Sequence, residues 1–539
     1  MKFKRSNLES KSYLVVDDFG DMRSLIKNML LSCGAGDIVA AMNGAQAIKA
    51  MERKRFDVVL CDYNLGSGKD GQQVLEEARH RQLIGLGTVF VMITAENTRE
   101  MVMGAVEYEP DSYLTKPFNK ELLRSRLEKL LAKKQDLLPI EKAVENRDFT
   151  LALELLNQKI AESPPNIGEL NKLKGEICLQ AGEVEEALVV YDKVLAVREM
   201  PWARLGLGKA LFGAKRYAEA RVVFQDLVNA NDRYTAAYDW LAKTCKCLNQ
   251  HQDAQDILQK AAKLSPRVIT RQQALGELAL SNNDVNTAEA AFSNAVKFGK
   301  HSVYKHPSVY ANLAKVVAEN KTGGEGLKVL KDMQREFADD SEAEFYNAAA
   351  ESVIQRSMGD SEKSEQALER ALEEYQKLGK DVSSEYSIEL AKTYTKLGDP
   401  DKATELFHQA VRNNHSDEEL LSELGATMQS LGLQEDPSSL ISEIRKEIIR
   451  LNNKGVELAR EGKLKESISL FEEAAEGMSG NKVVNLNAAR VLLMDIEQNN
   501  NYAGKINRVR VYLDRVKALD PDNQTLRKLN AKFQEIVGT

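Results

Sequence analysis

Two different hydrophobic patterns follow one another along the 539 residues of this chain. In the first part, short runs rich in valine and isoleucine alternate with segments that have the spacing of amphipathic helices. The expected strands are 13–16, 38–42, 58–61, 89–93 and 112–114, and the expected helices are 21–33, 44–53, 71–82, 98–108 and 119–133. Strands that are apolar on both faces and are joined by helices predict an α/β, doubly wound, five-stranded parallel sheet with right-handed crossovers.

From residue 139 onward the pattern is helical and repetitive. A small residue, a large apolar residue four positions later and a small or apolar residue three further on recur every 34 residues. The clearest copies begin at Ala220, Ala254 and Ala288 and have Phe224, Leu258 and Phe292 as the large residue. Units of this kind are pairs of antiparallel helices that stack on their neighbours, so an all-α superhelix follows the sheet.

Composition and charge narrow the classes of function. The net charge is −7, and residues 1–133 carry 20 Lys and Arg against 18 Asp and Glu, whereas the remainder carries 54 against 63. Without a basic tail, neither nucleic acid nor an anionic membrane is an expected partner. The start "MKFKRSNLES" lacks the apolar core of a signal peptide and no run reaches membrane-spanning length, which predicts a cytoplasmic protein. The five scattered cysteines are expected to be reduced and mostly buried.

Polar residues close four of the five predicted strands. Asp17 and Asp18 follow the first strand, Asp62 the third, Thr94 the fourth and Lys116 the fifth. The carboxyl ends of parallel strands meet at one edge of a sheet, so these side chains are expected to converge. Three carboxylates repel one another unless they share a hard cation, and oxygen ligands of this kind suit Mg²⁺. An aspartate beside Mg²⁺ and an ammonium group can attack a phosphoryl group, and a threonine hydroxyl can bind a phosphoryl oxygen.

The motifs "VVDD", "LCDYNL", "MITA" and "YLTKPF" occur in this order at the predicted strand ends. At these motifs the sequence resembles the flavodoxin-like receiver domain of bacterial two-component response regulators. The resemblance implies that Asp62 is the phosphoacceptor, that Asp17, Asp18, Asp62 and the backbone carbonyl of Asn64 are Mg²⁺ ligands, and that Lys116 and Thr94 assist catalysis.

The resemblance also implies a conformational switch. Thr94 and Tyr113 look like the pair in which phosphorylation draws the hydroxyl inward and the ring follows. Lys116 and Pro117 resemble the family's Lys-Pro dipeptide, whose peptide bond is usually cis. The loop "EYEPDSY" departs from the family pattern beside Tyr113, so a different surface shape is expected there with the same chemistry.

The second part resembles tetratricopeptide repeats, most clearly in "WLAKTCKCLNQHQDAQDILQKAAKLSP". The expected organisation is an N-terminal tail (1–10), the receiver (11–133), a helical linker (134–140), roughly ten repeats, some degenerate (141–524), and a C-terminal capping helix (525–539). Because few Gly, Ser or Pro residues interrupt the linker, one continuous helix is expected to run from the receiver to Pro139.

Candidate binding residues in the repeats are fewer. One position after the small residue of the first helix, four units carry lysine, namely Lys209, Lys243, Lys315 and Lys392. On the inner wall of the superhelix these lysines would suit an acidic peptide or carboxylate, although Glu277 interrupts the stripe and lysine is common at such positions. Trp202 and Trp240 are interpreted as packing residues. His301 and His306, in the insertion "KFGKHSVYKHPS", are interpreted as solvated loop residues.

These features favour a phosphorylation-switched adaptor. A sensor histidine kinase would phosphorylate Asp62, and the repeats would gain or lose an unidentified protein partner. A phosphoryl sink that competes in a histidine kinase pathway remains an alternative. A transcriptional regulator is disfavoured because the second part is acidic and lacks a recognition-helix module. A separate catalytic domain is not expected, since no further catalytic motif occurs, and homodimerisation stays open.

Overall fold

The computed structural model describes residues 8–95, 110–162, 164–338, 340–378, 384–499, 502, 504–521 and 523–537. The expected helix 98–108 lies outside these residues. The chain divides into two compact units, one made of 1–278 and 290–305 and the other of 279–289 and 306–539. Each unit is described by itself.

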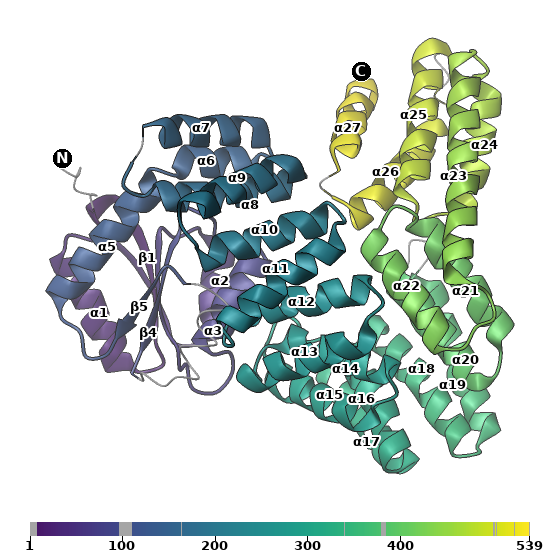
Figure 1. The fold of residues 1–539 in the computed structure, drawn as a ribbon, viewed down its shortest axis with the longest axis horizontal. Helices are drawn as coiled ribbons and strands as arrows, with labels where there is room; N and C mark the ends of the chain where they lie inside the picture. Colours follow the sequence, from purple (N-terminus) through teal and green to yellow (C-terminus); the bar gives the residue numbers. More distant parts are fainter. Residues whose placement is uncertain are drawn as a thin grey trace. The chain divides into compact units, whose positions relative to one another are not determined.

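The first unit begins with a five-stranded parallel sheet, as the sequence predicts (Figure 1). Its strands lie in the order β2-β1-β3-β4-β5. Their bounds are β1 (Ser12–Val16), β2 (Asp37–Ala41), β3 (Val58–Asp62), β4 (Val89–Thr94) and β5 (Ser112–Thr115). Every residue of β1 and β3 is buried, because helices cover both faces of the sheet.

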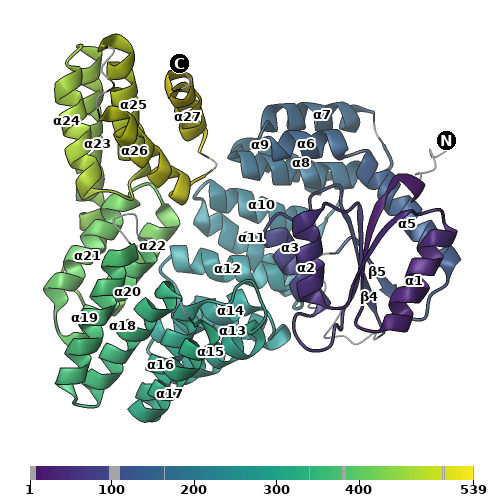
Figure 2. The same ribbon diagram turned by 180° about the vertical axis from the view of Figure 1, so that it is seen from behind.

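Four described helices cover the sheet, two on each face (Figure 2). Helices α2 (Gly44–Arg53) and α3 (Gly71–His80) pack on the face formed by Leu14 and Val16. Helices α1 (Gly20–Ser32) and α5 (Lys120–Gln135) pack on the opposite face. The short β-branched strands thus supply apolar side chains to two cores at once, which fixes the sheet between its helices.

The expected continuous linker helix is wrong. Helix α5 ends at Gln135, and α6 (Leu138–Glu145) begins after a turn in which the Leu137 N–H donates to the Lys134 carbonyl at 2.9 Å. Pro139 lies in the first turn of α6. The N–H groups of a first turn have no partner within the helix, so the N–H that proline lacks is not needed there. The chain therefore changes direction two residues before the proline that was expected to end the helix.

Helical hairpins make up the rest of the described chain. Their helices after α6 are α7 (Phe149–Ala161), α8 (Ile167–Ala181), α9 (Val184–Val197), α10 (Pro201–Gly213), α11 (Tyr217–Ala230), α12 (Thr235–Cys247), α13 (His251–Leu264), α14 (Ile269–Ser281), α15 (Val285–Gly299), α16 (Pro307–Asn320), α17 (Gly323–Glu336), α18 (Ser341–Ser357), α19 (Ser361–Leu378), α20 (Ser384–Leu397), α21 (Pro400–Asn413), α22 (Glu418–Ser430), α23 (Pro437–Arg460), α24 (Leu464–Gly477), α25 (Lys482–Asn499), α26 (Lys505–Leu519) and α27 (Gln524–Val537). Helix α27 buries Leu526, Leu529 and Phe533 in the core of the second unit.

The 34-residue pattern corresponds to a specific packing arrangement. A methyl group at Gly208 of α10 would lie 2.4 Å from the Phe224 ring of α11, and one at Gly276 of α14 would lie 2.7 Å from the Phe292 ring of α15. Both rings are fully buried. The small residue of one helix thus makes room for the large residue of the next, which is why the pair recurs together.

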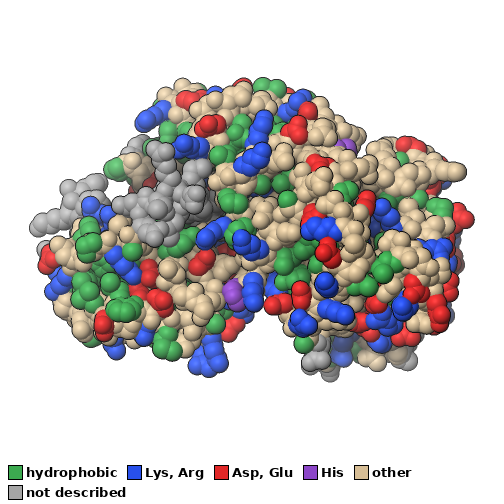
Figure 3. All heavy atoms as spheres, turned by 90° about the horizontal axis from the view of Figure 1, so that it is seen from below, with side chains coloured by type: hydrophobic (Ala, Val, Ile, Leu, Met, Phe, Trp, Pro, Cys, Tyr) green, Lys and Arg blue, Asp and Glu red, His purple; other side chains and the backbone are tan. Residues whose placement is uncertain are grey.

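The surface charge and the cysteines of the described residues do not point to a particular ligand. Acidic and basic side chains lie interspersed among the described residues of the face drawn in Figure 3. All five cysteines are free thiols; Cys61, Cys178 and Cys245 are buried, and Cys33 and Cys247 are half-buried. Among the described residues, no helix combines the length and the apolar character needed to cross a bilayer.

Candidate functional site

Three aspartates meet where β1 and β3 end. Asp17 is completely buried, Asp62 is 7% exposed and Asp18 faces solvent. One carboxylate oxygen from each lies within 4.8 Å of the others. Parallel pairing places Val16 beside Cys61, so the residues that follow them lie side by side at the same edge of the sheet.

Local hydrogen bonds fix the geometry of this acidic cluster. The Phe19 N–H donates to Asp17 Oδ1 at 2.8 Å, and Arg23 Nη1 donates to the Asp17 carbonyl at 2.6 Å. On the other side, the left-handed turn at Gly66 (φ 71°) passes close to Asp18, and a methyl group there would lie 3.0 Å from Asp18 Oδ2. Contacts with the backbone therefore hold the loop after β1 and the loop after β3 close to the cluster.

Lys116 joins the cluster from the end of β5. Its Nζ lies 2.9 Å from Asp17 Oδ2 and 2.9 Å from Asp62 Oδ2. The Lys116 N–H donates to the Thr94 carbonyl at 2.8 Å, which ties this residue to the end of β4. The Lys116–Pro117 peptide bond is cis.

Burial and charge act in opposite directions on these groups. Burial raises the pKa of Asp62, Lys116 opposes this rise, and the net pKa lies above its ordinary value, with Asp17 adding to the rise. Burial lowers the pKa of Lys116, but its hydrogen bonds to Asp17 and Asp62 outweigh burial and leave the pKa raised. A single ammonium is thus shared between two buried acids, and the cluster still favours additional positive charge.

The donor set fits a hard divalent cation. Three carboxylates supply oxygen atoms close together, Asp18 gives an approach from solvent, and Lys116 offsets only part of the negative charge. Mg²⁺ prefers such oxygen ligands and retains water at its open positions. Asp17, Asp18 and Asp62 would hold it.

The remaining receiver candidates surround the cluster. Asn64 is exposed in the β3–α3 loop, where its Oδ1 accepts the Gly66 N–H at 3.3 Å. Thr94 ends β4 and Tyr113 lies on the neighbouring β5, half-buried against the core beneath α2 and α3. Arg126 donates to the Tyr113 carbonyl at 2.8 Å. The switch movement implied for Thr94 and Tyr113 stays a prediction.

Three of the four candidate lysines of the repeats, Lys209, Lys243 and Lys315, are engaged within the chain. Lys209 lies over the Trp240 ring at 5.3 Å, and Lys243 lies over the same ring at 5.2 Å. In the second unit, Lys315 pairs with Glu389 at 2.6 Å, and Lys392 is half-buried on α20. Cation–π and ion-pair contacts of this kind already use the charge, so binding of an acidic partner by this stripe stays a prediction.

The interpretation of His306 as a solvated loop residue is wrong. His306 caps the N-terminus of α16, its Nε2 lies 2.9 Å from Glu342 Oε1, and its ring packs edge-on against Tyr346. His301, in contrast, is exposed. The pairing of His306 leaves no local pattern in the sequence, because its partner Glu342 lies on another helix, α18.

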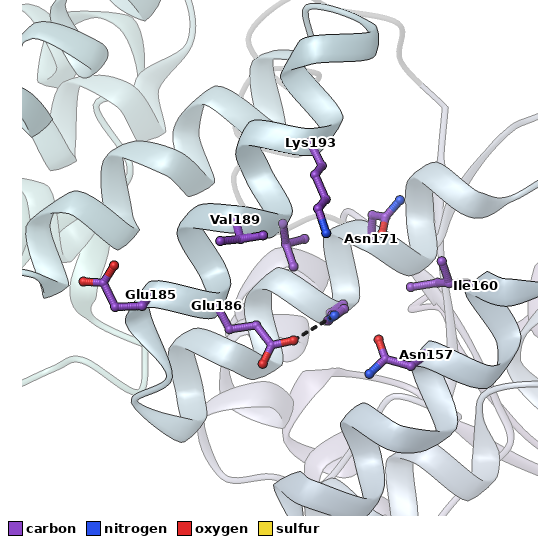
Figure 4. Close-up of a pocket in the computed structure, with 9 residues that line it drawn as sticks. Asn157, Ile160, Asn171, Glu185, Glu186, Val189 and Lys193 are labelled. Atoms are coloured by element: carbon purple, nitrogen blue, oxygen red, sulfur yellow. Dashed lines mark ion pairs between the residues drawn. The ribbon is translucent and has the colours of Figure 1, made fainter.

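A surface pocket of about 540 Å³ lies between α7, α8 and α9 (Figure 4). Positively charged lysines and negatively charged glutamates both line the pocket, and Lys174 pairs with Glu186 at 2.9 Å. The residues that line it are Asn157, Ile160, Asn171, Lys174, Glu185, Glu186, Val189, Val190 and Lys193. Its mixed lining does not favour one class of ligand.

Comparison with known proteins supports the predicted class of each part of the chain, the receiver and the repeats. The response regulator receiver domain model matches residues 13–128, tetratricopeptide repeat models match 141–201 and 178–243, and a PPR repeat model matches 390–415. Chemotaxis protein CheY-3 of Vibrio cholerae is 33% identical over 117 residues, which are 22% of this chain and 88% of that protein. Chemotaxis protein CheY of Pseudomonas aeruginosa is 32% identical over 117 residues, 22% of this chain and 93% of that protein.

Among solved structures, the chemotaxis response regulator CheY4 of Vibrio cholerae is 26% identical and covers 22% of this chain and 98% of its own, with a TM-score of 0.21. The doubly wound sheet with acidic residues and a lysine at its carboxyl edge defines a receiver domain. The chain belongs to the response regulator receiver family through residues 13–128, and tetratricopeptide repeats follow this domain.

Proposed function

We propose that this protein is a two-component response regulator in which phosphorylation of Asp62 by a sensor histidine kinase controls protein binding by the repeats. The observation that carries this proposal is the position of Asp62, whose carboxylate lies 2.9 Å from Lys116 Nζ and within 4.8 Å of carboxylate oxygens of two further aspartates. The repeats offer an extended surface for a protein partner, and cytoplasmic location accompanies this function.

The proposed reaction transfers a phosphoryl group from a kinase phosphohistidine to Asp62. An Asp62 oxygen attacks phosphorus as the P–N bond breaks, and the imidazole leaves with its bonding electrons and takes up a proton. Lys116 can balance charge that develops on the phosphoryl oxygens, and Thr94 can donate a hydrogen bond to one of them. Mg²⁺, held by Asp17, Asp18 and Asp62 with the Asn64 carbonyl, would supply further positive charge there.

The acceptance step can be tested with a small phosphoryl donor. Full-length protein incubated with Mg²⁺ and acetyl phosphate should gain one phosphoryl group by intact-mass measurement, and Asp62→Asn should gain none. Asp136→Asn, at the exposed C-cap of α5, is the matched control and should behave as wild type. Equal labelling of the Asp62→Asn variant would contradict the assignment of the phosphoacceptor.

The output can be tested by capture of proteins from the source cells. Wild type with Mg²⁺ and beryllofluoride, a phosphoryl mimic, should retain a different protein from Asp62→Asn. Identical retention would contradict the switched adaptor. It would leave the phosphoryl sink as the better description of the receiver.

A further inference from the structure

Helix α3 of the receiver contacts a distant loop within the same compact unit. The contacted residues are 298–304, which comprise the last two residues of α15 and the first part of the loop that leads to α16, and they are named the 298–304 segment. Ser302 Oγ donates to Glu76 Oε2 at 2.9 Å across 226 positions of sequence. Both residues are buried, with 7% of Ser302 and 5% of Glu76 exposed. A serine from the repeats thus reaches a buried carboxylate of the receiver.

Further contacts extend along this side of α3. Gln73 Nε2 donates to the Phe298 carbonyl at 3.3 Å, and the rings of His80 and Tyr304 meet edge-on with centroids 5.3 Å apart. Together with the Glu76 contact, they lie at positions 73, 76 and 80, which share one face of a helix. One continuous face of α3 therefore rests on the 298–304 segment.

The repeats hold the 298–304 segment in shape for this contact. Gln273 Nε2 of α14 donates to the Tyr304 carbonyl at 3.2 Å, and the Tyr304 N–H donates to Ser302 Oγ at 3.1 Å. The Arg267 guanidinium lies 6.0 Å from the centroid of the Phe298 ring. The 298–304 segment is thus held by α14 and by the residue Arg267 that precedes this helix, and not by the receiver alone.

The first residue of α3 packs against the proposed phosphoacceptor, Asp62. Gly71, the first residue of α3, packs against the Asp62 backbone so closely that a methyl group would lie 2.2 Å from the Asp62 carbonyl. The Gly71 N–H donates to the Tyr63 carbonyl at 2.7 Å. The first turn of α3 cannot shift without a change in the backbone that carries Asp62.

The loop that precedes α3 makes a second connection. Gly66 lies against Asp18 of the acidic cluster, and Lys69, three residues later, donates from Nζ to the His301 carbonyl at 2.8 Å. One short loop therefore touches the metal-binding carboxylates and the repeats. Asp70, which caps α3, completes the turn by accepting the Gln73 N–H at 2.8 Å.

From this geometry we propose that α3 and the 298–304 segment form the contact through which the state of Asp62 reaches the repeats. The inference rests on the proposed function and names the surface that would be switched. Glu76, which accepts the Ser302 hydroxyl in this contact, is buried, and its loss of water has to be offset by well-placed partners. In this proposal, loading of Asp62 changes the backbone against which Gly71 packs and so displaces α3. The displacement lengthens the hydrogen bonds between α3 and the 298–304 segment, and the contact becomes weaker.

Hydrogen exchange of the full-length protein tests this coupling. With Mg²⁺ and beryllofluoride, peptides that cover 298–304 should exchange at least about fivefold faster, within the usual range of coupling between sites. Asp62→Asn should not respond, and peptides of α24, in the other unit, serve as the unchanged reference. Unchanged exchange at 298–304, while peptides of the β3–α3 loop do respond, would overturn the inference and leave the proposed function standing. Failure of the β3–α3 loop to respond would instead contradict the proposed function.

Two variants test the same contact in opposite directions. By linkage, a weaker contact must favour binding at Asp62 by the same factor. Ser302→Ala removes a donor to Glu76 and should strengthen beryllofluoride binding by about fivefold, measured by ¹⁹F NMR titration. Glu76→Gln keeps the side-chain size, removes the buried charge and should weaken that binding. Ser438→Ala, at an exposed position of α23, is the control. Wild-type affinity in both contact variants would overturn the inference.

Discussion

The Lys116 ammonium lies 2.9 Å from the Asp62 carboxylate, although Asp62 ends β3 and Lys116 follows β5, and β4 lies between these two strands. The same ammonium is 2.9 Å from Asp17. One cation therefore serves two buried acids, and any change at Lys116 alters the electrostatics of the whole cluster. Chemistry and stability are linked at this residue.

Replacement of Lys116 by alanine should slow phosphoryl acceptance by roughly 10²-fold, the usual cost of removing one group that stabilises charge in a transition state. Without Mg²⁺ the variant should also lose about 1–3 kcal/mol of stability, because buried carboxylates lose a charged partner. Acetyl phosphate labelling rates and thermal unfolding in EDTA measure the two effects. Lys129→Ala, at an exposed position of α5, should change neither. Wild-type labelling by Lys116→Ala would contradict this role.

Replacement of Asp17 by asparagine should weaken Mg²⁺ binding. The completely buried Asp17 supplies one of three clustered carboxylates, and the amide has no negative charge. Mg²⁺ should raise the unfolding temperature of the wild-type receiver by mass action, and this rise should be smaller or lost in Asp17→Asn. Thermal unfolding followed with increasing Mg²⁺ measures the difference. An equal Mg²⁺ effect in both proteins would contradict the assignment of Asp17 as a ligand.

The sheet and its edge were predictable because they depend on local sequence. Five short runs of β-branched residues specify the strands, and the expected bounds differ from the observed ones by at most one residue. Parallel pairing then brings Asp17 and Asp62 to the same edge without further information. The break between α5 and α6 is not predictable in this way, because Asp136 and Leu137 are both compatible with a helix. The turn formed by these two residues ends α5 without a helix-breaking residue.

The contact of α3 with the repeats could not be predicted from local pattern. Glutamate side chains are mostly exposed in folded proteins, yet Glu76 and Glu77 are both buried. Ser302 lies in an insertion between two helices, and its partner stands 226 positions earlier. Tertiary contacts of this kind override the usual exposure of charged residues and leave no periodic signal.

Substitution of Gly208 by alanine should destabilise the first unit by about 1–3 kcal/mol, because the new methyl group would overlap the buried Phe224 ring. Gly168→Ala is the matched control, since it lies in α8 with nothing within 4 Å of the added atom. That control should be neutral or more stable, as alanine is the better helix former. Thermal unfolding of both variants measures the difference. Equal effects would contradict the packing role of the glycine.

Stability of the second unit should fall as pH rises through the pKa of His306. Burial lowers this pKa, but the hydrogen bond and charge of Glu342, aided by Glu385 and Asp340, outweigh burial and raise it above 6.5. A histidine whose pKa is raised by folding contributes stability that is fully present below the unfolded pKa and is lost above the folded one. The contribution should be small, about 0.2–1 kcal/mol, because 36% of the imidazole is exposed.

NMR titration of the six histidines measures the pKa of His306 directly. His306→Gln should flatten the change in unfolding temperature between about pH 6 and pH 8, the interval around the ordinary histidine pKa. Glu342→Gln should lower the pKa of His306, because the largest opposing charge is removed while the ring stays buried. A His306 pKa at or below the ordinary histidine value in the wild type would contradict the pairing, since burial would then outweigh Glu342.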